Sequence, residues 1–206
     1  MKKGANYFLA IMLTFSVAGT LAAQNENPSK RLHAMDVPRW AIKTNLLYDA
    51  TTTINLGTEF SVGRRYTLDL SGNYNPWTYS HSRKVKHFMV QPELRYWLCE
   101  SFYGHFLAVH GIYAHYNVGG VSNPFGFFPA LKRYRYQGNL YGGGVAYGYH
   151  QILSPRWSLE YEVGVGYIYT KYNKFACERC GELKDKQSKG YFTPTKVAVS
   201  LIYIIK

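Results

Sequence analysis

The sequence predicts an all-β protein, an eight-stranded antiparallel transmembrane β-barrel of the outer-membrane type with a filled lumen. Three observations predict this fold. Apolar and polar residues alternate along several segments, the connections between these segments differ in length in a regular way, and the chain starts with a secretory signal. Apolar residues do not recur at helical spacing over any long stretch, so few helices are expected.

The N-terminus has the three-part layout of a secretory signal peptide. Lys2 and Lys3 form a positive start, residues 7–18 are an uncharged and mostly apolar run, and small residues follow. This run is shorter than the ~20 residues that a membrane-spanning helix needs, which favours a cleaved signal over an anchor. The predicted organisation is a signal peptide over 1–23, a short periplasmic extension over 24–38 and a β-barrel domain over 39–206.

Alternation with a period of two is the pattern of a strand whose two faces meet different surroundings. Four segments alternate strictly: residues 54–62, 66–74, 159–170 and 196–205. Four further strands are predicted from a weaker pattern: residues 40–48, 88–98, 104–116 and 136–149. In the segment 104–116 both faces carry apolar residues, so its facing is ambiguous.

The predicted connections fall into two classes. The short ones are residues 63–65, 99–103 and 151–156, and the long ones are residues 75–87, 117–135 and 172–191. Outer-membrane barrels have short periplasmic turns and longer extracellular loops, which this arrangement matches. The connection at 49–53 departs from the rule.

One face of the predicted strands carries charges of both signs, and the other face is apolar. We expect the charged face to line the lumen, because opposite charges can pair inside a small barrel that side chains fill. The apolar face would then contact lipid, with tyrosine and tryptophan near the strand ends as interfacial girdles. The candidate lumen network comprises Glu59, Asp69, Glu93, Arg95, Glu160, Glu162 and Lys196.

Several stretches also resemble a known family. The most specific is QPELRYWLCE at 91–100 followed by GHF at 104–106; KTNLLYDATTT at 43–53, LSGNYNPW at 70–77 and YNVGG at 116–120 accompany it. Together they resemble a Bacteroidetes outer-membrane family catalogued as domain of unknown function 3575. The resemblance implies a small barrel similar in architecture to the OmpA and OmpX barrels, often encoded near fimbrial and surface-adhesin assembly genes. It implies no catalytic residues.

Cys177 and Cys180 lie in the last predicted loop. Such a pair can be a redox dithiol, half of a zinc site or a small disulfide. No thioredoxin-like unit and no second cysteine pair accompany it, which favours a loop disulfide in an oxidising compartment. Cys99 is left unpaired.

Basic residues cluster in the predicted loops, in a chain with a formal charge of +12. They can bind anionic glycans or a partner protein, or neutralise lipopolysaccharide phosphates. We expect a non-enzymatic protein of the cell outer membrane with a structural or adhesive role, and the family resemblance implies an association with fimbriae. The expected partners are outer-membrane lipid, lipopolysaccharide and surface or fimbrial proteins, with no nucleic acid, cofactor or metal.

Two alternatives stay open. A lipid A-modifying hydrolase would need a histidine, a serine and an acid together on the outer barrel surface, and His110 or His150 with a neighbouring serine is the candidate. A soluble, lipocalin-like periplasmic barrel would instead place its apolar face inside and bind a small apolar ligand there.

Overall fold

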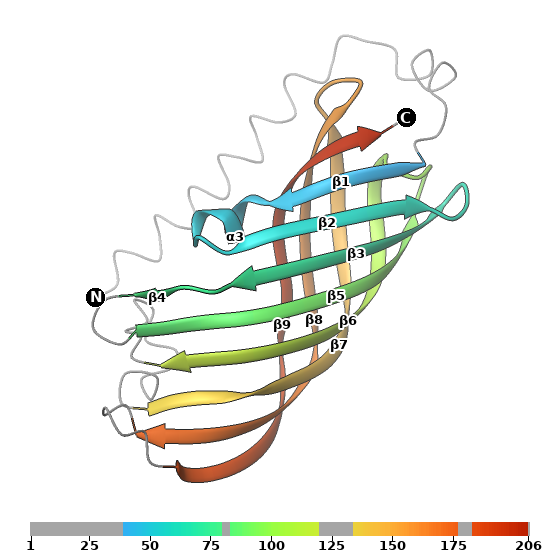
Figure 1. Ribbon diagram of the computed structural model, residues 1–206. Coiled ribbons are helices and arrows are strands. Elements are labelled where there is room, and N and C mark those ends of the chain that lie inside the picture. Colours follow the sequence, from blue (N-terminus) through green and yellow to red (C-terminus); the bar gives the residue numbers. More distant parts are fainter. Residues whose placement is uncertain (1–38, 80–82, 120–133, 177–182, 206) are drawn as a thin grey trace, which may run out of the picture. The chain divides into compact units, whose positions relative to one another are not determined.

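The computed structural model describes residues 39–79, 83–119, 134–176 and 183–205. The predicted signal peptide and N-terminal extension, and Cys177 and Cys180, lie outside these residues. Within the described ranges no helix has both the length and the apolar character needed to cross a membrane. The elements are β1 (Trp40–Asn45), α3 (Leu46–Ala50), β2 (Ile54–Ser61), β3 (Tyr66–Asn75), β4 (Thr78–Tyr79), β5 (Arg83–Trp97), β6 (Gly104–Gly119), β7 (Tyr134–Ile152), β8 (Trp157–Ala176) and β9 (Leu183–Ile205) (Figure 1).

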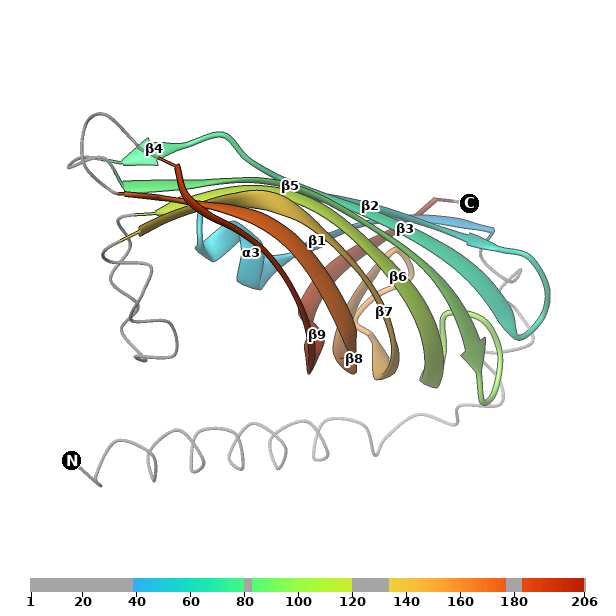
Figure 2. The same cartoon turned by 90° about the horizontal axis from the view of Figure 1, so that it is seen from below.

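Eight of these strands form a closed antiparallel ring in the order β1-β2-β3-β5-β6-β7-β8-β9. The pairing of β9 with β1 and that of β3 with β5 complete it, while the short β4 pairs only with β5. Each long strand therefore lies beside its neighbours in the sequence, as in up-and-down barrels. Figure 2 shows β5 to β9 curving together. The predicted all-β class and the eight antiparallel strands are confirmed.

The prediction of a strand over 40–48 is wrong in its second half, because β1 ends at Asn45 and α3 follows. The Asn45 side chain accepts a hydrogen bond from the Leu47 amide at 3.1 Å and caps the helix. Asp49 lies in the first turn, where the helix dipole favours a carboxylate. Apolar residues in this segment resemble a strand, but the capping residue starts a helix.

The long predicted loops are shorter than expected, because strands extend into them. Most of the segment 172–191 is paired: β8 continues to Ala176, and β9 begins at Leu183. The segment 75–87 likewise contains β4 and the start of β5. Lysine and asparagine on both faces hide the alternation there, but ladder hydrogen bonds do not require an apolar face. Residues 120–133 of the segment 117–135 lie outside the described residues.

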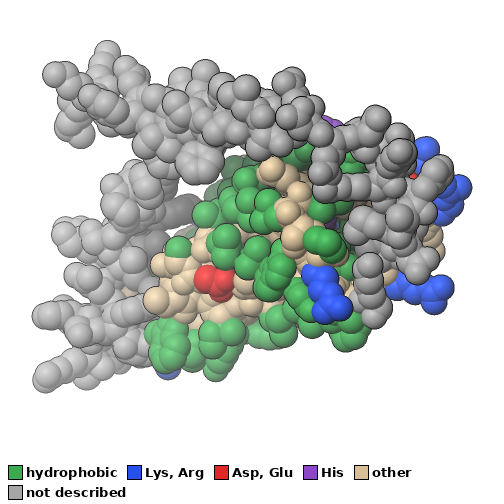
Figure 3. Space-filling view, turned by 90° about the horizontal axis from the view of Figure 1, so that it is seen from above, with side chains coloured by type: hydrophobic (Ala, Val, Ile, Leu, Met, Phe, Trp, Pro, Cys, Tyr) green, Lys and Arg blue, Asp and Glu red, His purple; other side chains and the backbone are tan. Residues whose placement is uncertain are grey.

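Burial in the ring is inverted relative to a water-soluble protein. Among the described residues, 19 buried side chains are polar or charged, whereas the 11 buried apolar residues include five alanines. On the outside, 33 large hydrophobic side chains are exposed. Figure 3 shows them spread over the visible surface, interrupted by few charged groups. In β6 the ambiguity of facing is resolved, since Phe106 and Ala108 point inward and Leu107 and Val109 outward.

A small aromatic cluster fills one end of the ring. Trp97 and Phe106 are fully buried with ring centroids 4.8 Å apart, and Phe102 packs on Trp97 from the turn after β5. Phe102 adopts a φ of 64°, a left-handed conformation that is costly for a bulky residue. Gly148 makes room for this cluster, because a Cβ there would lie 2.2 Å from the Phe106 ring. Cζ of Arg95 lies 4.4 Å from the centroid of the Phe106 ring, so the cluster contacts the charged side chains of the interior.

Candidate functional site

The structure brings all seven predicted lumen residues together inside the ring. They project from β2, β3, β5, β8 and β9, and each is buried or nearly so. Successive strands of a closed ring place their inward-facing side chains on one interior, so residues far apart in the sequence meet there.

Arg95 stands at the centre of this network. Its Nε lies 2.6 Å from Glu93 Oε1, on the same strand. Its Nη1 lies 2.9 Å from Glu59 Oε2 and 2.8 Å from Glu160 Oε2. Its Nη2 lies 2.9 Å from Glu162 Oε2. The guanidinium therefore joins β5 to β2 on one side and to β8 on the other, and its planar fork suits several carboxylates at once.

Two lysines complete the pairing. Lys196 Nζ lies 2.6 Å from Glu93 Oε2 and 3.1 Å from Glu162 Oε2. Lys43 Nζ lies 2.6 Å from Glu59 Oε2 and also contacts Asp69. Sequence reasoning missed Lys43. Its position in the strand could have indicated it, because Lys43 stands two residues after Ala41 and therefore shares the inward face of β1 with that buried residue.

Neutral side chains link the network to the aromatic cluster. Thr67 Oγ1 donates a hydrogen bond to Glu59 Oε1 at 2.5 Å, and Trp97 Nε1 donates to Thr67 Oγ1 at 2.9 Å. His110 Nδ1 lies 3.7 Å from Glu93, and His150 Nδ1 lies 3.6 Å from Glu160. The described network holds five carboxylates and three cations. If all of these groups are ionised, the network has two more negative than positive charges, and the two histidines lie beside it.

The space between these groups is small. A polar cavity of about 20 Å³ lies among Lys43, Asp69, Gln91 and Glu162, and Tyr48 of α3 covers part of it. Burial raises the pKa of the Tyr48 phenol above its usual value, against the opposing effect of Lys196. A cavity of this size holds about one water molecule. At this level, the described side chains leave no room for a solute.

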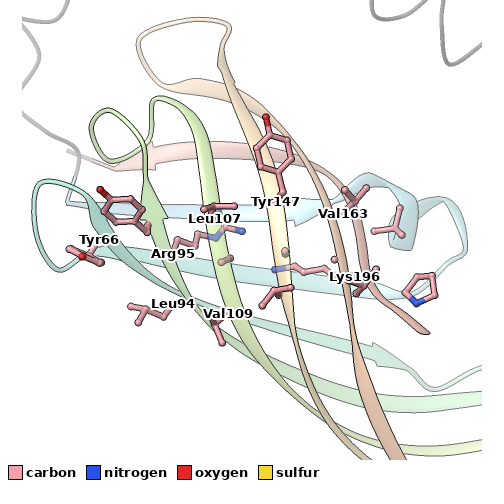
Figure 4. A pocket seen from close by; sticks show the side chains of 16 residues that line it. Tyr66, Leu94, Arg95, Leu107, Val109, Tyr147, Val163 and Lys196 are labelled. Atoms are coloured by element: carbon pink, nitrogen blue, oxygen red, sulfur yellow. The ribbon is translucent and has the colours of Figure 1, made fainter. Parts of the chain in front are cut away.

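The outer surface carries a larger, apolar hollow. It has a volume of about 790 Å³, extends from Tyr66 at the start of β3 across β5 to β9, and is lined by outward residues such as Leu94, Val109 and Val163 (Figure 4). Arg95 and Lys196 also border it, but their charged ends meet Glu93 and Glu162 on the inner side of the wall. The hollow offers van der Waals contact and very little polar surface.

The other candidate sites do not assemble. The described residues contain no group of three or more histidine, cysteine, aspartate or glutamate side chains that could hold a metal ion. Cys99 is an exposed free thiol. His110 and His150, at 3% and 1% exposure, face the interior and not the outer surface. His105 faces outward, where its Nδ1 lies 2.6 Å from the Tyr147 hydroxyl.

Comparison with known proteins identifies the family. A family model described as protein of unknown function, DUF3575, matches residues 9–205. The chain belongs to the DUF3575 family. The DUF3575 match includes every described strand, so the charged interior and the apolar outer surface both lie within the family region. The resemblance to domain of unknown function 3575 that the motifs carry is confirmed. No curated protein and no solved structure gives a match.

Proposed function

We propose that this protein is a non-enzymatic β-barrel of the Gram-negative outer membrane with a structural or adhesive role at the cell surface. The inverted burial carries this proposal. Exposed apolar surface costs about 25 cal/mol per Å² in water, and lipid removes that cost. A closed ring also satisfies its backbone hydrogen bonds internally, which a lipid environment demands.

The outer face of β8 supports a position across a bilayer. Val163 and Val165 lie between Trp157, the first residue of β8, and Tyr167 and Tyr169, beyond which the strand continues to Ala176. Aromatic residues at both ends of an apolar band are typical of the two membrane interfaces. The band spans roughly the 9–11 residues that a tilted membrane strand needs. In the proposed orientation the short turns lie at the periplasmic end and the extended hairpins at the outer end.

The interior supports a structural role and disfavours transport. An eight-stranded barrel is narrow, and here charged side chains occupy its centre around Arg95. Any recognition would then occur on the extended hairpins at the outer end, because connecting segments on a rigid scaffold are the usual home of binding sites. A link to fimbriae rests on the family resemblance alone.

The two alternatives fit the geometry less well. A lipocalin-like barrel needs an apolar internal cavity, whereas the described interior is charged and holds about 20 Å³ of space. A lipid A hydrolase needs its histidine at the outer surface, whereas His110 and His150 are buried inside the ring. Ser158, on the strand next to His150, is fully buried as well.

Cell fractionation tests the proposal. The protein should be recovered in the outer-membrane fraction and should migrate faster on SDS gels before boiling than after, as closed barrels do. A cysteine that replaces Ser188 should react with a surface label in intact cells, whereas a cysteine that replaces Arg64 should react only after the cells are lysed. Release of the protein by osmotic shock would overturn the membrane assignment and favour a soluble periplasmic barrel.

A further inference from the structure

The first half of β9 has a neighbouring strand on one side only. β8 pairs with β9 as far as Leu183, whereas β1 pairs with it only as far as Ser200. Figure 1 shows β1 beside the C-terminal part of β9 alone. The cause is the early end of β1 at Asn45, where the chain turns into α3. In the described part of the chain, no strand continues the sheet beyond this edge of β9.

Side chains of the ring satisfy the part of the edge nearest to β1. Asn45 Nδ2 donates to the Val197 carbonyl at 3.4 Å, and Asn45 Oδ1 accepts from the Val199 amide at 3.3 Å. Gln91 Nε2 donates to the Thr195 carbonyl at 3.3 Å. Pro194 has no amide hydrogen to offer. The open edge therefore consists of residues 185–193 of β9, whose side chains from 185 to 192 are all exposed.

This open edge has a definite chemistry. Unpaired backbone amides and carbonyls along a strand are a template for a further strand. Lys186 and Lys189 lie on the edge, while the single acid there, Asp185, accepts a hydrogen bond from Gln187. Lys171, on the adjacent β8, adds positive charge. Phe192, at 76% exposure, supplies an apolar anchor.

We propose that the open edge of β9 binds an extended, acidic segment of a partner protein by adding it to the sheet as a further strand. Backbone hydrogen bonds would supply affinity, and carboxylates opposite Lys186 and Lys189 would supply selectivity. A second copy of this chain is disfavoured, because it would bring the same lysines to the same edge. The proposal depends on the pairing of β9 and not on the membrane assignment, so either can fail alone.

Binding of synthetic peptides to the purified full-length protein in detergent micelles tests the proposal. Lys186 and Lys189 stand three residues apart and therefore lie on opposite faces of β9. The probe is accordingly a short fluorescent valine-rich peptide whose two glutamates also stand three residues apart. One control peptide replaces glutamate by lysine. The other carries N-methyl groups on alternate amides, which removes the hydrogen-bond donors from one edge of the peptide. Fluorescence anisotropy measures affinity, and amide hydrogen exchange locates the bound segment on the protein.

We expect the glutamate peptide to bind at least about tenfold more tightly than either control, and to slow exchange in residues 185–193. The double variant Lys186→Glu, Lys189→Glu should weaken binding about tenfold or more. The matched variant Arg64→Glu, Arg65→Glu, which changes charge equally at the opposite end of the ring, should not.

Three results would overturn the proposal. Equal affinity for the N-methylated peptide would mean that charge alone attracts the probe. The test concerns the amides of residues 185–193 that point away from β8, since β8 already bonds the others. Slow exchange of these outward amides before any peptide is added would mean that another part of the chain already covers the edge. Concentration-dependent self-association that the Lys186→Glu, Lys189→Glu variant alters would assign the edge to a second copy.

Discussion

At the scale of single residues, the interior of the ring contains charged side chains that are almost completely buried. Arg95 is 1% exposed and contacts four carboxylates that come from three strands. Removing a charge from water is costly, and only close partners offset that cost.

Replacement of Arg95 by methionine should therefore destabilise the protein strongly. The variant Arg95→Met keeps most of the side-chain volume but leaves buried carboxylates without their cation, at a cost of about 3–5 kcal/mol. The urea midpoint of the fast-migrating gel form measures this loss. The control is Arg64→Met, which breaks an exposed pair with Glu100 and should change the midpoint little. Equal effects would mean that the interior is hydrated.

Gly57 is the second residue whose identity the interior dictates. A Cβ at this position would lie 2.7 Å from Cγ of Lys43, so the variant Gly57→Ala must displace the Lys43 stem from its carboxylate partners. We expect a loss of about 1–3 kcal/mol in the same unfolding assay. Gly72→Ala is the matched control, since the nearest atom there is 3.9 Å away. Indistinguishable midpoints would contradict the close packing around Lys43.

At the scale of elements, the strands of the ring differ greatly in length. β1 has six residues and β9 has 23, so the sheet is closed at the end with short turns and extends unevenly at the other. The uneven lengths arise from Asn45, which ends one strand by capping a helix, and from the long β8–β9 hairpin. The band on the outer face is common to all eight strands and does not depend on these extensions.

The depth of a residue within this band should decide how it tolerates charge. Val163 and Val62 are exposed to similar extents, 59% and 63%, but Val163 lies mid-strand and Val62 lies next to a short turn. If lipid covers the band, Val163→Arg should cost about 2–4 kcal/mol and Val62→Arg about 0–1 kcal/mol. Folding titrations into lipid vesicles give both values. Similar small costs at both positions would argue that water, not lipid, contacts the band.

At the scale of the whole molecule, the residues that close the ring and the edge proposed to bind a partner occupy different regions. β1 closes the ring against residues 200–205 of β9, and the charged network reaches Lys196, whereas the open edge consists of residues 185–193. Removal of an extended hairpin should therefore leave the ring intact, because the hydrogen bonds between strands within the ring do not depend on the hairpins.

Truncation of the longest hairpin tests this separation. Residues Lys171 and Ser188 face each other across β8 and β9, so replacing residues 172–187 with an Asn-Gly turn keeps their register. We expect the truncated protein to reach the outer membrane with unchanged heat-modifiability and to lose surface adhesion or fimbrial display. The comparable replacement of residues 118–136, which joins the paired Asn117 and Gln137, is the control. Failure of insertion after truncation would show that the hairpin is part of the folding unit.

The sequence by itself determined the all-β class, the eight strands and the inward position of the charged residues. These follow from alternation, which is a local property: side chains two residues apart share a face wherever the strand lies. The motif at 91–106 likewise sufficed to recognise the DUF3575 family. The predicted signal peptide and the Cys177–Cys180 pair stay predictions.

Only the tertiary structure decided which charges meet, where the strands end and which edge is left open. Lys43 joins the network because ring closure places β1 beside β9, a contact between the two ends of the chain that no local pattern encodes. β8 and β9 continue through a lysine-rich segment because each supplies the other's hydrogen bonds. The open edge of β9 exists because Asn45 ends its neighbour first, and such an absence of pairing is visible only once every other pairing is known.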